Sequence, residues 1–258
     1  MMGNRAAADV SMRYGFRGPC EAIVTACAAG THSVGVGARL VATGRCDVVF
    51  AGSAEAAITA IGEAGFSNMT ALSTSGVSMP FDAGRDGFVM AEGGAVLVLE
   101  DMDRARARGA RIYAEILGAA STADAHHITA PPPGGSGAVS CMEQALLDAG
   151  VTADAITHIN AHGTSTPAND LAEGVAIGKV FGHPGPAVTS IKGITGPSLG
   201  AAGSIEAVAL ALNLTNRMIP ATAGPTNQDP DIKLDVVTGA PRPWEPGPAL
   251  SHSFGFGG

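Results

Sequence analysis

The chain has 258 residues, which is enough for one large or two medium domains with a sizeable hydrophobic core. Hydrophobic residues make up 46% and charged residues 15%, with 36 glycines, a balance that favours a tightly packed α/β protein over a disordered or fibrous one. The net charge is −8 and no block of Lys or Arg is interleaved with aromatic residues, so nucleic acid is not an expected partner.

Cysteine usage and hydropathy indicate the compartment. The four cysteines show no metal-ligand spacing, and in a chain of this length they favour a reducing compartment over a disulfide framework. No signal-peptide pattern opens the sequence, and no apolar run reaches the ~18 residues of a membrane span. We therefore expect a cytoplasmic protein without membrane association.

The first part of the chain alternates predicted strands and helices. In chain order these are a helix at 1–17, a strand at 20–26, a helix from Cys27 to about Thr43, a strand at 47–52, a strand at 95–99 and an arginine-rich amphipathic helix at 101–111. The strand at 20–26, the helix after it and the strand at 47–52 are predicted to form a βαβ unit.

Near Arg111 a second series of alternating predicted strands and helices begins. The predicted elements are a strand at 112–117, a helix at 140–149, a strand at 156–161, a helix at 170–181, a strand at 188–191, a helix at 201–213 and a last strand at 250–254. Strands alternating with helices indicate α/β layers with a largely parallel sheet.

Three reactive side chains stand where predicted strands end. Cys27 lies at a sharp strand-to-helix turn, where the helix N-terminus favours a thiolate and small neighbours leave room for a thioester or ketone. His162 and Lys192 each follow a later strand. Because the carboxyl ends of parallel strands meet at one edge of a sheet, we expect these three residues to share one site.

Each of these residues also has a plain structural explanation when taken alone, because single buried cysteines and histidines are common. A neutral imidazole at His162 can donate through Nε2 to a developing oxyanion. The hydroxyls of Thr164 and Thr166 suit hydrogen bonding to a polar carrier arm. Lys192, if buried, needs a partner, for which Glu206 on the following helix is our candidate.

The motifs in their order carry a resemblance to a known family. They are Thr25-Ala26-Cys27, Pro80-Phe81-Asp82, residues 85–88, residues 160–167, Ser190-Ile191-Lys192, residues 200–203 and residues 253–258. Jointly they resemble the β-ketoacyl-acyl-carrier-protein synthases of type II fatty acid synthesis, over essentially the whole chain. The Thr-Ser-Thr-Pro run after His162 is more similar to the discrete elongating enzymes than to modular polyketide ketosynthases.

The resemblance implies an α/β, thiolase-like layered αβαβα fold and a decarboxylative Claisen condensation. By analogy, Cys27 takes the acyl chain from acyl carrier protein, and the backbone N–H groups of Cys27 and Phe256 hold the oxyanion. His162 polarises the malonyl thioester carbonyl. Lys192 and Glu206 order the charges of the site.

The same resemblance assigns the residues that bind the substrate. Phe254 and Phe256 gate entry, Phe66 lines the acyl pocket, and Thr164 and Thr166 hold the pantetheine arm. No cofactor is implied, because the substrates are carried on the phosphopantetheine of acyl carrier protein. A homodimer is expected.

Two features depart from the family pattern. Where the family has Thr-Gly-His after the lysine, this chain has Thr195-Gly196-Pro197, so the second active-site histidine is missing. Proline has no donor, and the loss of one such donor typically costs ~10²–10³ in rate. His183 is expected at the surface and His127 in a substrate-side loop, so neither is taken as a replacement.

The chain is also shorter than the family pattern at both ends, so we expect an incomplete fold. Residues 1–110 are expected to form part of the N-terminal half, with the nucleophile Cys27. Residues 111–258 are expected to form the C-terminal half without its last strand, and the central sheets would then expose unpaired edges.

The leading hypothesis is a condensing synthase that is acylated but condenses poorly. The alternative is a non-catalytic or half-active acyl-binding subunit, which Pro197 favours and Cys27 opposes. A cysteine hydrolase would pair Cys27 with His162 and admit water. A thiolase would need a second cysteine near the C-terminus, where residues 253–256 stand instead. The acyl chain length, and the choice between fatty acid and polyketide synthesis, stay open.

Overall fold

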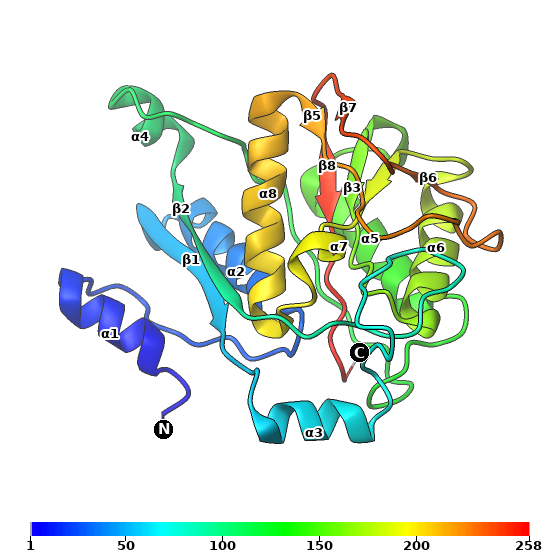
Figure 1. Cartoon of the computed structure of the whole chain (residues 1–258). Helices are drawn as coiled ribbons and strands as arrows, with labels where there is room; N and C mark the ends of the chain where they lie inside the picture. Colours follow the sequence, from blue (N-terminus) through cyan, green and yellow to red (C-terminus); the bar gives the residue numbers. More distant parts are fainter. Residues whose placement is uncertain (1, 258) are drawn as a thin grey trace.

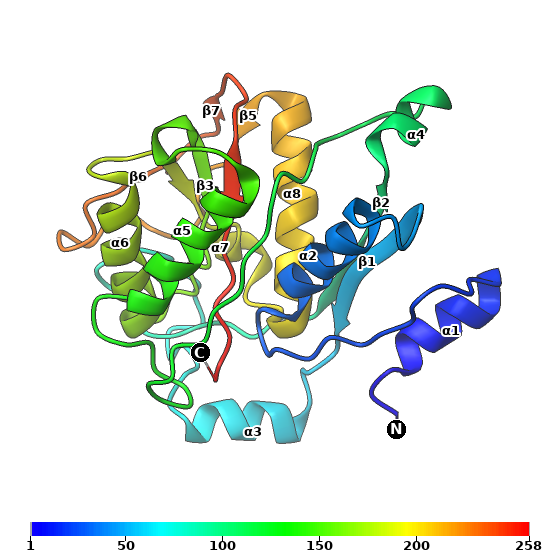
Figure 2. The ribbon, with the colours of Figure 1, turned by 180° about the vertical axis from the view of Figure 1, so that it is seen from behind.

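Two helices of small residues pack together at the centre of the molecule. The computed structural model describes residues 2–257. Helix α2 (Ala29–Ala42) lies against helix α8 (Ala202–Asn216), and this pair separates two sheets, as Figures 1 and 2 show from opposite sides. Sheet and helix layers therefore alternate, which agrees with the predicted layered α/β architecture.

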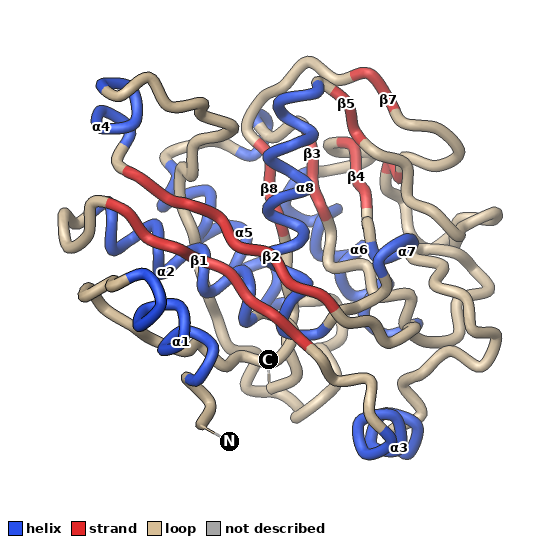
Figure 3. The backbone as a smooth tube through the Cα atoms, turned by 60° about the vertical axis from the view of Figure 1, so that its left-hand side comes forward, coloured by secondary structure: helices blue, strands red, loops and turns tan. Residues whose placement is uncertain are grey.

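The first sheet is a two-stranded antiparallel ribbon. Strand β1 (Val48–Glu55) pairs with β2 (Gly93–Glu100) along its whole length, with Val48 opposite Glu100 and Glu55 opposite Gly93. Figure 3 shows the two strands running side by side. Helix α1 (Arg5–Tyr14) ends near this ribbon, where Phe16 packs edge-on against Phe50.

The prediction of a strand at 20–26 is wrong. That segment contributes only a single bridge, between Thr25 and Cys27, and the βαβ unit expected around it is not formed. The physical reason is pairing: within residues 2–257 no strand lies beside this segment, and a β-branched run cannot become a strand without a neighbour.

The second sheet is parallel, as predicted. Its order is β6-β4-β3-β8, formed by β3 (His158–Asn160), β4 (Ala187–Thr189), β6 (Asp235–Val236) and β8 (Ala249–Ser251). Helices α5 (Ser136–Ala149) and α6 (Pro167–Phe181) cover its outer face (Figure 2). Fully buried residues between them, among them Ile159, Ile177 and Val188, form the main core.

The strand predicted at 112–117 is also wrong. The chain there is extended but joins no sheet, and residues 112–118 make no backbone hydrogen bond within the described residues. Ala119 N–H donates instead to the Asp148 carboxylate at the end of α5 (2.9 Å). The apolar pattern at 112–117 therefore predicts the extended chain correctly, but it is wrong in predicting a strand of a sheet.

Shorter elements complete the fold. They are α3 (Ala60–Asn68), α4 (Met102–Ala107), the 3-10 turns Ala153–Ala155 and Leu199–Ala201, α7 (Lys192–Thr195), and the paired strands β5 (Met218–Ile219) and β7 (Arg242–Pro243). The arginine-rich helix is shorter than the 101–111 prediction, whereas α2, α6 and α8 fall close to the predicted ranges. Within residues 2–257, no helix combines the length and apolar character needed to cross a bilayer.

The contact between α2 and α8 depends on glycine. A Cβ on Gly30 would lie 2.5 Å from the Ser204 backbone nitrogen and 2.7 Å from Ser53 Oγ, and a Cβ on Gly203 would lie 2.5 Å from the Thr31 backbone nitrogen. The backbone atoms leave no room for a side chain on either helix. Close approach at this point therefore sets the distance between the two central helices.

Substitution of Gly30 tests this packing. We expect Gly30→Ala to lower the free energy of unfolding by about 1–3 kcal/mol, because the new methyl group must push α8 away from α2. Gly65→Ala in α3 is the matched control, since a Cβ there meets nothing within 4 Å, and it should stabilise by about 0.5–1 kcal/mol. Urea unfolding of both variants measures the difference, and equal stability of the two would contradict the tight contact.

Candidate active site

Cys27 sits on a strained turn at the start of α2. Ala28 N–H donates to Thr25 O (3.0 Å), Ala29 N–H donates to Ala26 O (3.1 Å), and Ala26 has a φ of 47°, in the left-handed region that non-glycine residues rarely adopt. The thiol is half-buried. The turn that the sequence predicts at Cys27 is therefore present at the start of α2.

The charge state of Cys27 differs from the expectation of a helix-stabilised thiolate. Burial raises the pKa of the thiol above its usual value, the Lys192 ammonium opposes this, and the Glu55 and Glu206 carboxylates add to it. Desolvation outweighs the favourable charge. The resting group is therefore a thiol, and its proton must be lost when the sulfur reacts.

His162 is the second residue after β3 and is 4% exposed. Burial and the nearby Lys192 charge hold the pKa of its imidazole well below the usual range, so the ring is neutral at pH 7. Lys192 Nζ lies 3.4 Å from Nδ1. An ammonium group can only donate, so Nδ1 accepts and the ring proton is assigned to Nε2. This is the tautomer that can donate to a substrate oxygen.

Lys192 and Glu206 form the predicted buried pair. Both side chains are 1% exposed, and the ammonium donates directly to Glu206 Oε1. Burial raises the pKa of the Glu206 carboxyl, and the adjacent ammonium opposes that shift. Lys192 stands at the first residue of α7, just beyond the predicted strand end, and so contacts His162 and Glu206 together.

The other predicted site residues have different surroundings. Phe254 packs edge-on against His162, with ring centroids 5.4 Å apart, and Thr164 Oγ1 lies 2.9 Å from Thr166 Oγ1. Phe256 is 42% exposed at the end of the described chain. Phe66 packs on Phe88, 5.3 Å away, so the predicted acyl-pocket residue contacts the motif at 85–88.

The loop before Phe256 lies on the nucleophile turn. A Cβ at Gly255 would fall 2.7 Å from Thr25 O and 3.5 Å from the Ala28 backbone nitrogen. Only glycine allows this approach. The backbone at Gly255 is therefore held against the turn that carries Cys27.

Sequence reasoning missed two buried carboxylates on α6. Glu173 accepts hydrogen bonds from the backbone N–H groups of His162 (2.7 Å) and Gly163 (2.8 Å). Asp170 accepts from Phe81 N–H (2.8 Å), and burial raises its pKa to about 6. Their spacing of three residues on one helix was a signal that this polar face points inward.

The Pro80-Phe81-Asp82 motif and residues 85–88 are hydrogen-bonded to other segments of the chain. Asp82 accepts from the backbone N–H groups of Thr226 (2.7 Å) and Asn227 (2.8 Å), and Arg85 donates to Asp229 (2.6 Å). Asp86 accepts from the N–H groups of residues 74 and 75. These bonds tie residues 73–88 to the loop between β5 and β6, and the Phe81 N–H ties the same segment to Asp170 on α6.

Pro197 is buried after α7 and offers only its carbonyl, which accepts from Ala91 N–H (3.1 Å). Neither His183 nor His127 lies in its place, because both are on exposed loops and bond to backbone atoms there. The missing donor is thus a property of the folded site.

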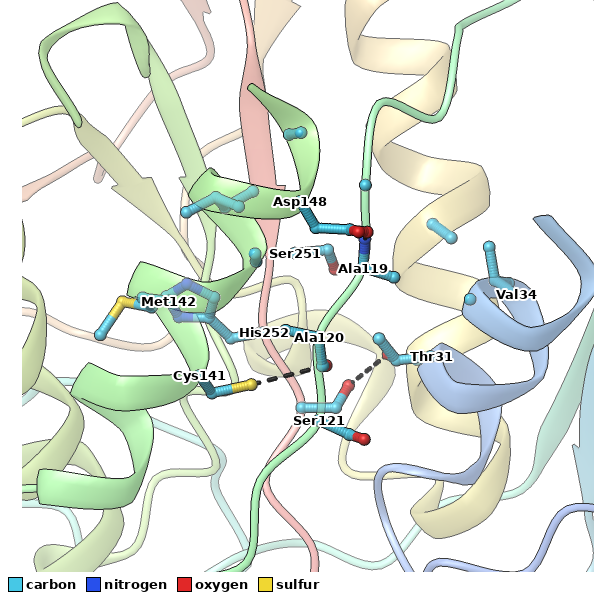
Figure 4. Close-up of a pocket in the computed structure, with 18 of the residues that line it drawn as sticks. Thr31, Val34, Ala119, Ala120, Ser121, Cys141, Met142, Asp148, Ser251 and His252 are labelled. Carbon is cyan, nitrogen blue, oxygen red and sulfur yellow. Dashed lines mark hydrogen bonds between the residues drawn. The ribbon is translucent and has the colours of Figure 1, made fainter. Parts of the chain in front are cut away.

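A groove of about 1550 Å³ runs along one side of β8 (Figure 4). Its walls come from α2, residues 113–124, α5 and residues 246–255, and Thr31 Oγ1 lies 2.6 Å from Ser253 Oγ within it. The groove reaches Ala28 and Gly255, beside the nucleophile turn. No group of three or more His, Cys, Asp or Glu residues in the described chain is arranged to hold a metal ion.

Alkylation of Cys27 tests its charge state. We expect its reaction with iodoacetamide to keep accelerating above pH 9, because burial raises the thiol pKa and only the thiolate reacts. Glu55→Gln should move the midpoint to lower pH, since the Glu55 carboxylate disfavours the thiolate. Peptide mapping by mass spectrometry separates Cys27 from the other cysteines. A rate that levels off below pH 8 would contradict the burial argument.

Comparison with known proteins identifies the family. Residues 1–105 match the family model of the β-ketoacyl synthase N-terminal domain, and residues 113–225 match that of the β-ketoacyl synthase C-terminal domain. The chain is 45% identical to 3-oxoacyl-[acyl-carrier-protein] synthase 2 of Synechocystis, over 100% of this chain and 64% of that protein. It is 44% identical to the synthase 2 of Vibrio cholerae, over 99% of this chain and 64% of that protein.

Solved structures of ketosynthases are also similar to this chain. A type II polyketide ketosynthase, in complex with its acyl-carrier protein and bound to the hexaketide, matches with a TM-score of 0.96 at 37% identity, over 99% of this chain and 64% of that one. The ishigamide ketosynthase/chain length factor matches with a TM-score of 0.95 at 37% identity, over 100% and 63%. These matches confirm the thiolase-like fold, and the chain spans about 64% of the length of the curated relatives. The chain belongs to the β-ketoacyl synthase family.

Proposed function

We propose that this chain carries the catalytic centre of a β-ketoacyl-acyl-carrier-protein synthase of fatty acid elongation. The observation that carries the proposal is the contact of Lys192 with Nδ1 of a neutral, buried His162, which leaves an Nε2 proton for a substrate carbonyl. The names of the relatives, 3-oxoacyl-[acyl-carrier-protein] synthases, support the same reaction.

In the first half-reaction Cys27 accepts the acyl chain. Its sulfur attacks the thioester carbonyl of an acyl carrier, and the carrier thiol leaves with the proton that Cys27 gives up. The oxyanion formed between these steps lies against the N–H groups of Cys27 and Phe256, a placement supported by the contact of Gly255 with the Cys27 turn.

In the second half-reaction the bound acyl group is extended. A malonyl thioester loses carbon dioxide, and the electron pair of the broken bond forms an enolate whose oxygen accepts the Nε2–H of His162. The enolate carbon then attacks the Cys27 thioester and releases the sulfur. Pro197 gives this oxygen no second imidazole donor. We therefore expect condensation to be about 10²–10³-fold slower than it would be with that donor.

Acyl carrier protein is the proposed partner. One similar solved structure is a ketosynthase in complex with its acyl-carrier protein. On this chain the paired hydroxyls of Thr164 and Thr166 would hold the pantetheine arm that follows His162, and Phe254 and Phe256 would gate its entry. Phe66 would line the acyl pocket, and the working enzyme would be a homodimer.

A half-active acyl-binding subunit is the second candidate, and Pro197 is the observation that favours it. The strained Cys27 turn and the buried Lys192–Glu206 pair count against a wholly inactive site, since a buried ion pair is costly to maintain without use. The two candidates differ in one step: both form an acyl adduct on Cys27, and only the synthase turns it into a β-ketoacyl product.

Intact-mass spectrometry separates these outcomes. The protein is incubated with acyl carrier substrate, and malonyl carrier is then added. We expect an acyl adduct that Cys27→Ala abolishes, followed by slow loss of the adduct as β-ketoacyl product forms. A persistent adduct without product would establish the half-active subunit. No adduct on folded protein would overturn both.

Restoring the missing donor gives a second test. We expect Pro197→His to raise the condensation rate by about 10²-fold while acylation stays within threefold, because the new imidazole acts only on the malonyl carbonyl. Pro230→His, which places an imidazole on the surface, is the matched control. Equal condensation rates in wild type and Pro197→His would show that Pro197 does not limit the reaction.

A further inference from the structure

A buried histidine outside the predicted site contacts the carboxylate that holds the chain at His162. His252 is the first residue after β8, and it is 6% exposed. We propose that His252 is a positioning residue: it fixes the Glu173 carboxylate, which in turn fixes the backbone of His162 and Gly163. This inference rests on the proposed function, because it assigns a role to His252 in the step that His162 performs.

Glu173 is the first link. Its carboxylate is 1% exposed on α6, and one oxygen accepts the N–H of His162 while the other accepts the N–H of Gly163. Gly163 has a φ of 36°, and a Cβ there would lie 2.5 Å from Ser190 Cβ, so the chain turns sharply at this point. The carboxylate therefore sets the direction in which the chain, and with it the imidazole of His162, leaves β3.

His252 is the second link. Its N–H donates to Asn160 O (2.9 Å), which aligns it with the end of β3, and its Nδ1 lies 3.4 Å from Glu173 Oε1. A carboxylate can only accept, so Nδ1 carries a proton. The His252 ring also packs 5.9 Å from that of Phe254, which itself packs against His162.

The second ring nitrogen of His252 is buried and has no hydrogen-bond partner among residues 2–257. Both His252 and Glu173 line the groove beside β8, and Figure 4 shows His252 among its walls. A buried polar atom without a partner is costly, so the ring is held there by its other contacts. Those contacts are the one between Nδ1 and Glu173 and the packing of the ring against Phe254.

The titratable and charged groups around His252 come from several elements. Glu173 faces it from α6, and His162 lies beyond Phe254 at the end of β3. Lys192 on α7 pairs with Glu206 on α8, so that ammonium is engaged elsewhere. The Glu173 carboxylate also accepts from Asn169 Nδ2 (3.5 Å), and His252 adds a further donor to it.

Three substitutions separate positioning from packing. His252→Asn keeps an N–H group at the place of Nδ1, whereas His252→Leu has a branched side chain without a donor. His252→Gln, which moves its amide toward the place of Nε2, is a second variant without the donor if the leucine variant does not fold. His183→Leu is the matched control, since His183 is exposed and its ring contacts Lys233 O, away from Glu173.

NMR of the backbone amide protons of His162 and Gly163 reads the link without any assay of activity. We expect both signals to move upfield and lose protection from hydrogen exchange in His252→Leu, while His252→Asn and His183→Leu stay like wild type. Signals unchanged in His252→Leu and His252→Gln would overturn the inference, whether or not the protein is a synthase.

Kinetics of the same variants then test the role in the reaction. We expect decarboxylation of malonyl carrier to fall about 10- to 100-fold in His252→Leu, because a misplaced imidazole donates poorly, while acylation of Cys27 stays within threefold. His252→Asn should recover decarboxylation to within threefold of wild type. Loss of both half-reactions together would show a general packing defect and overturn the positioning role. A wild type that neither acylates nor decarboxylates would overturn the proposed function, and the NMR result would stand by itself.

Discussion

The buried ammonium of Lys192 is the interaction on which the site depends. A charge in the interior is tolerated only when it is paired and hydrogen-bonded, and here the Glu206 carboxylate on α8 provides the pair. A second N–H of the ammonium reaches Nδ1 of His162. One charge thus couples α8 to the end of β3 and also decides where the His162 proton resides.

The central helix contact brings the reactive groups within range of that charge. Cys27 stands at the start of α2 and Glu206 on α8, and glycines at positions 30 and 203 let the two backbones touch. A wider spacing would move the thiol away from Lys192, the cation that lowers its pKa against the effect of burial. Packing of small residues in the middle of the molecule is therefore an electrostatic requirement as well as a steric one.

The sequence predicted most of what is local and less of what is long-range. The turn at Cys27 and helices α2, α6 and α8 follow from residue patterns within a few positions, whereas the Lys192–Glu206 pair, 14 positions apart, follows from the need of a buried lysine for a partner. The strands at 20–26 and 112–117 do not form, because a strand needs a neighbour and a β-branched run carries no information about that neighbour. Glu173 and His252 were missed for the same reason: they are 79 positions apart in sequence, and only the fold brings the carboxylate to the ring.

In the proposed reaction, the groups that would serve the two half-reactions are largely separate. Acyl transfer would use the Cys27 thiol and the backbone N–H groups of the loop that approaches the nucleophile turn at Gly255. Condensation would use the Nε2 proton of His162, and Pro197 contributes no donor beside it. With a second imidazole, a small rotation of either ring could be absorbed by the other. Without it, the orientation of His162 alone governs how well the enolate oxygen is stabilised, so the groups that hold its ring and backbone, Lys192 and Glu173, carry more of the reaction than they would in a two-histidine site.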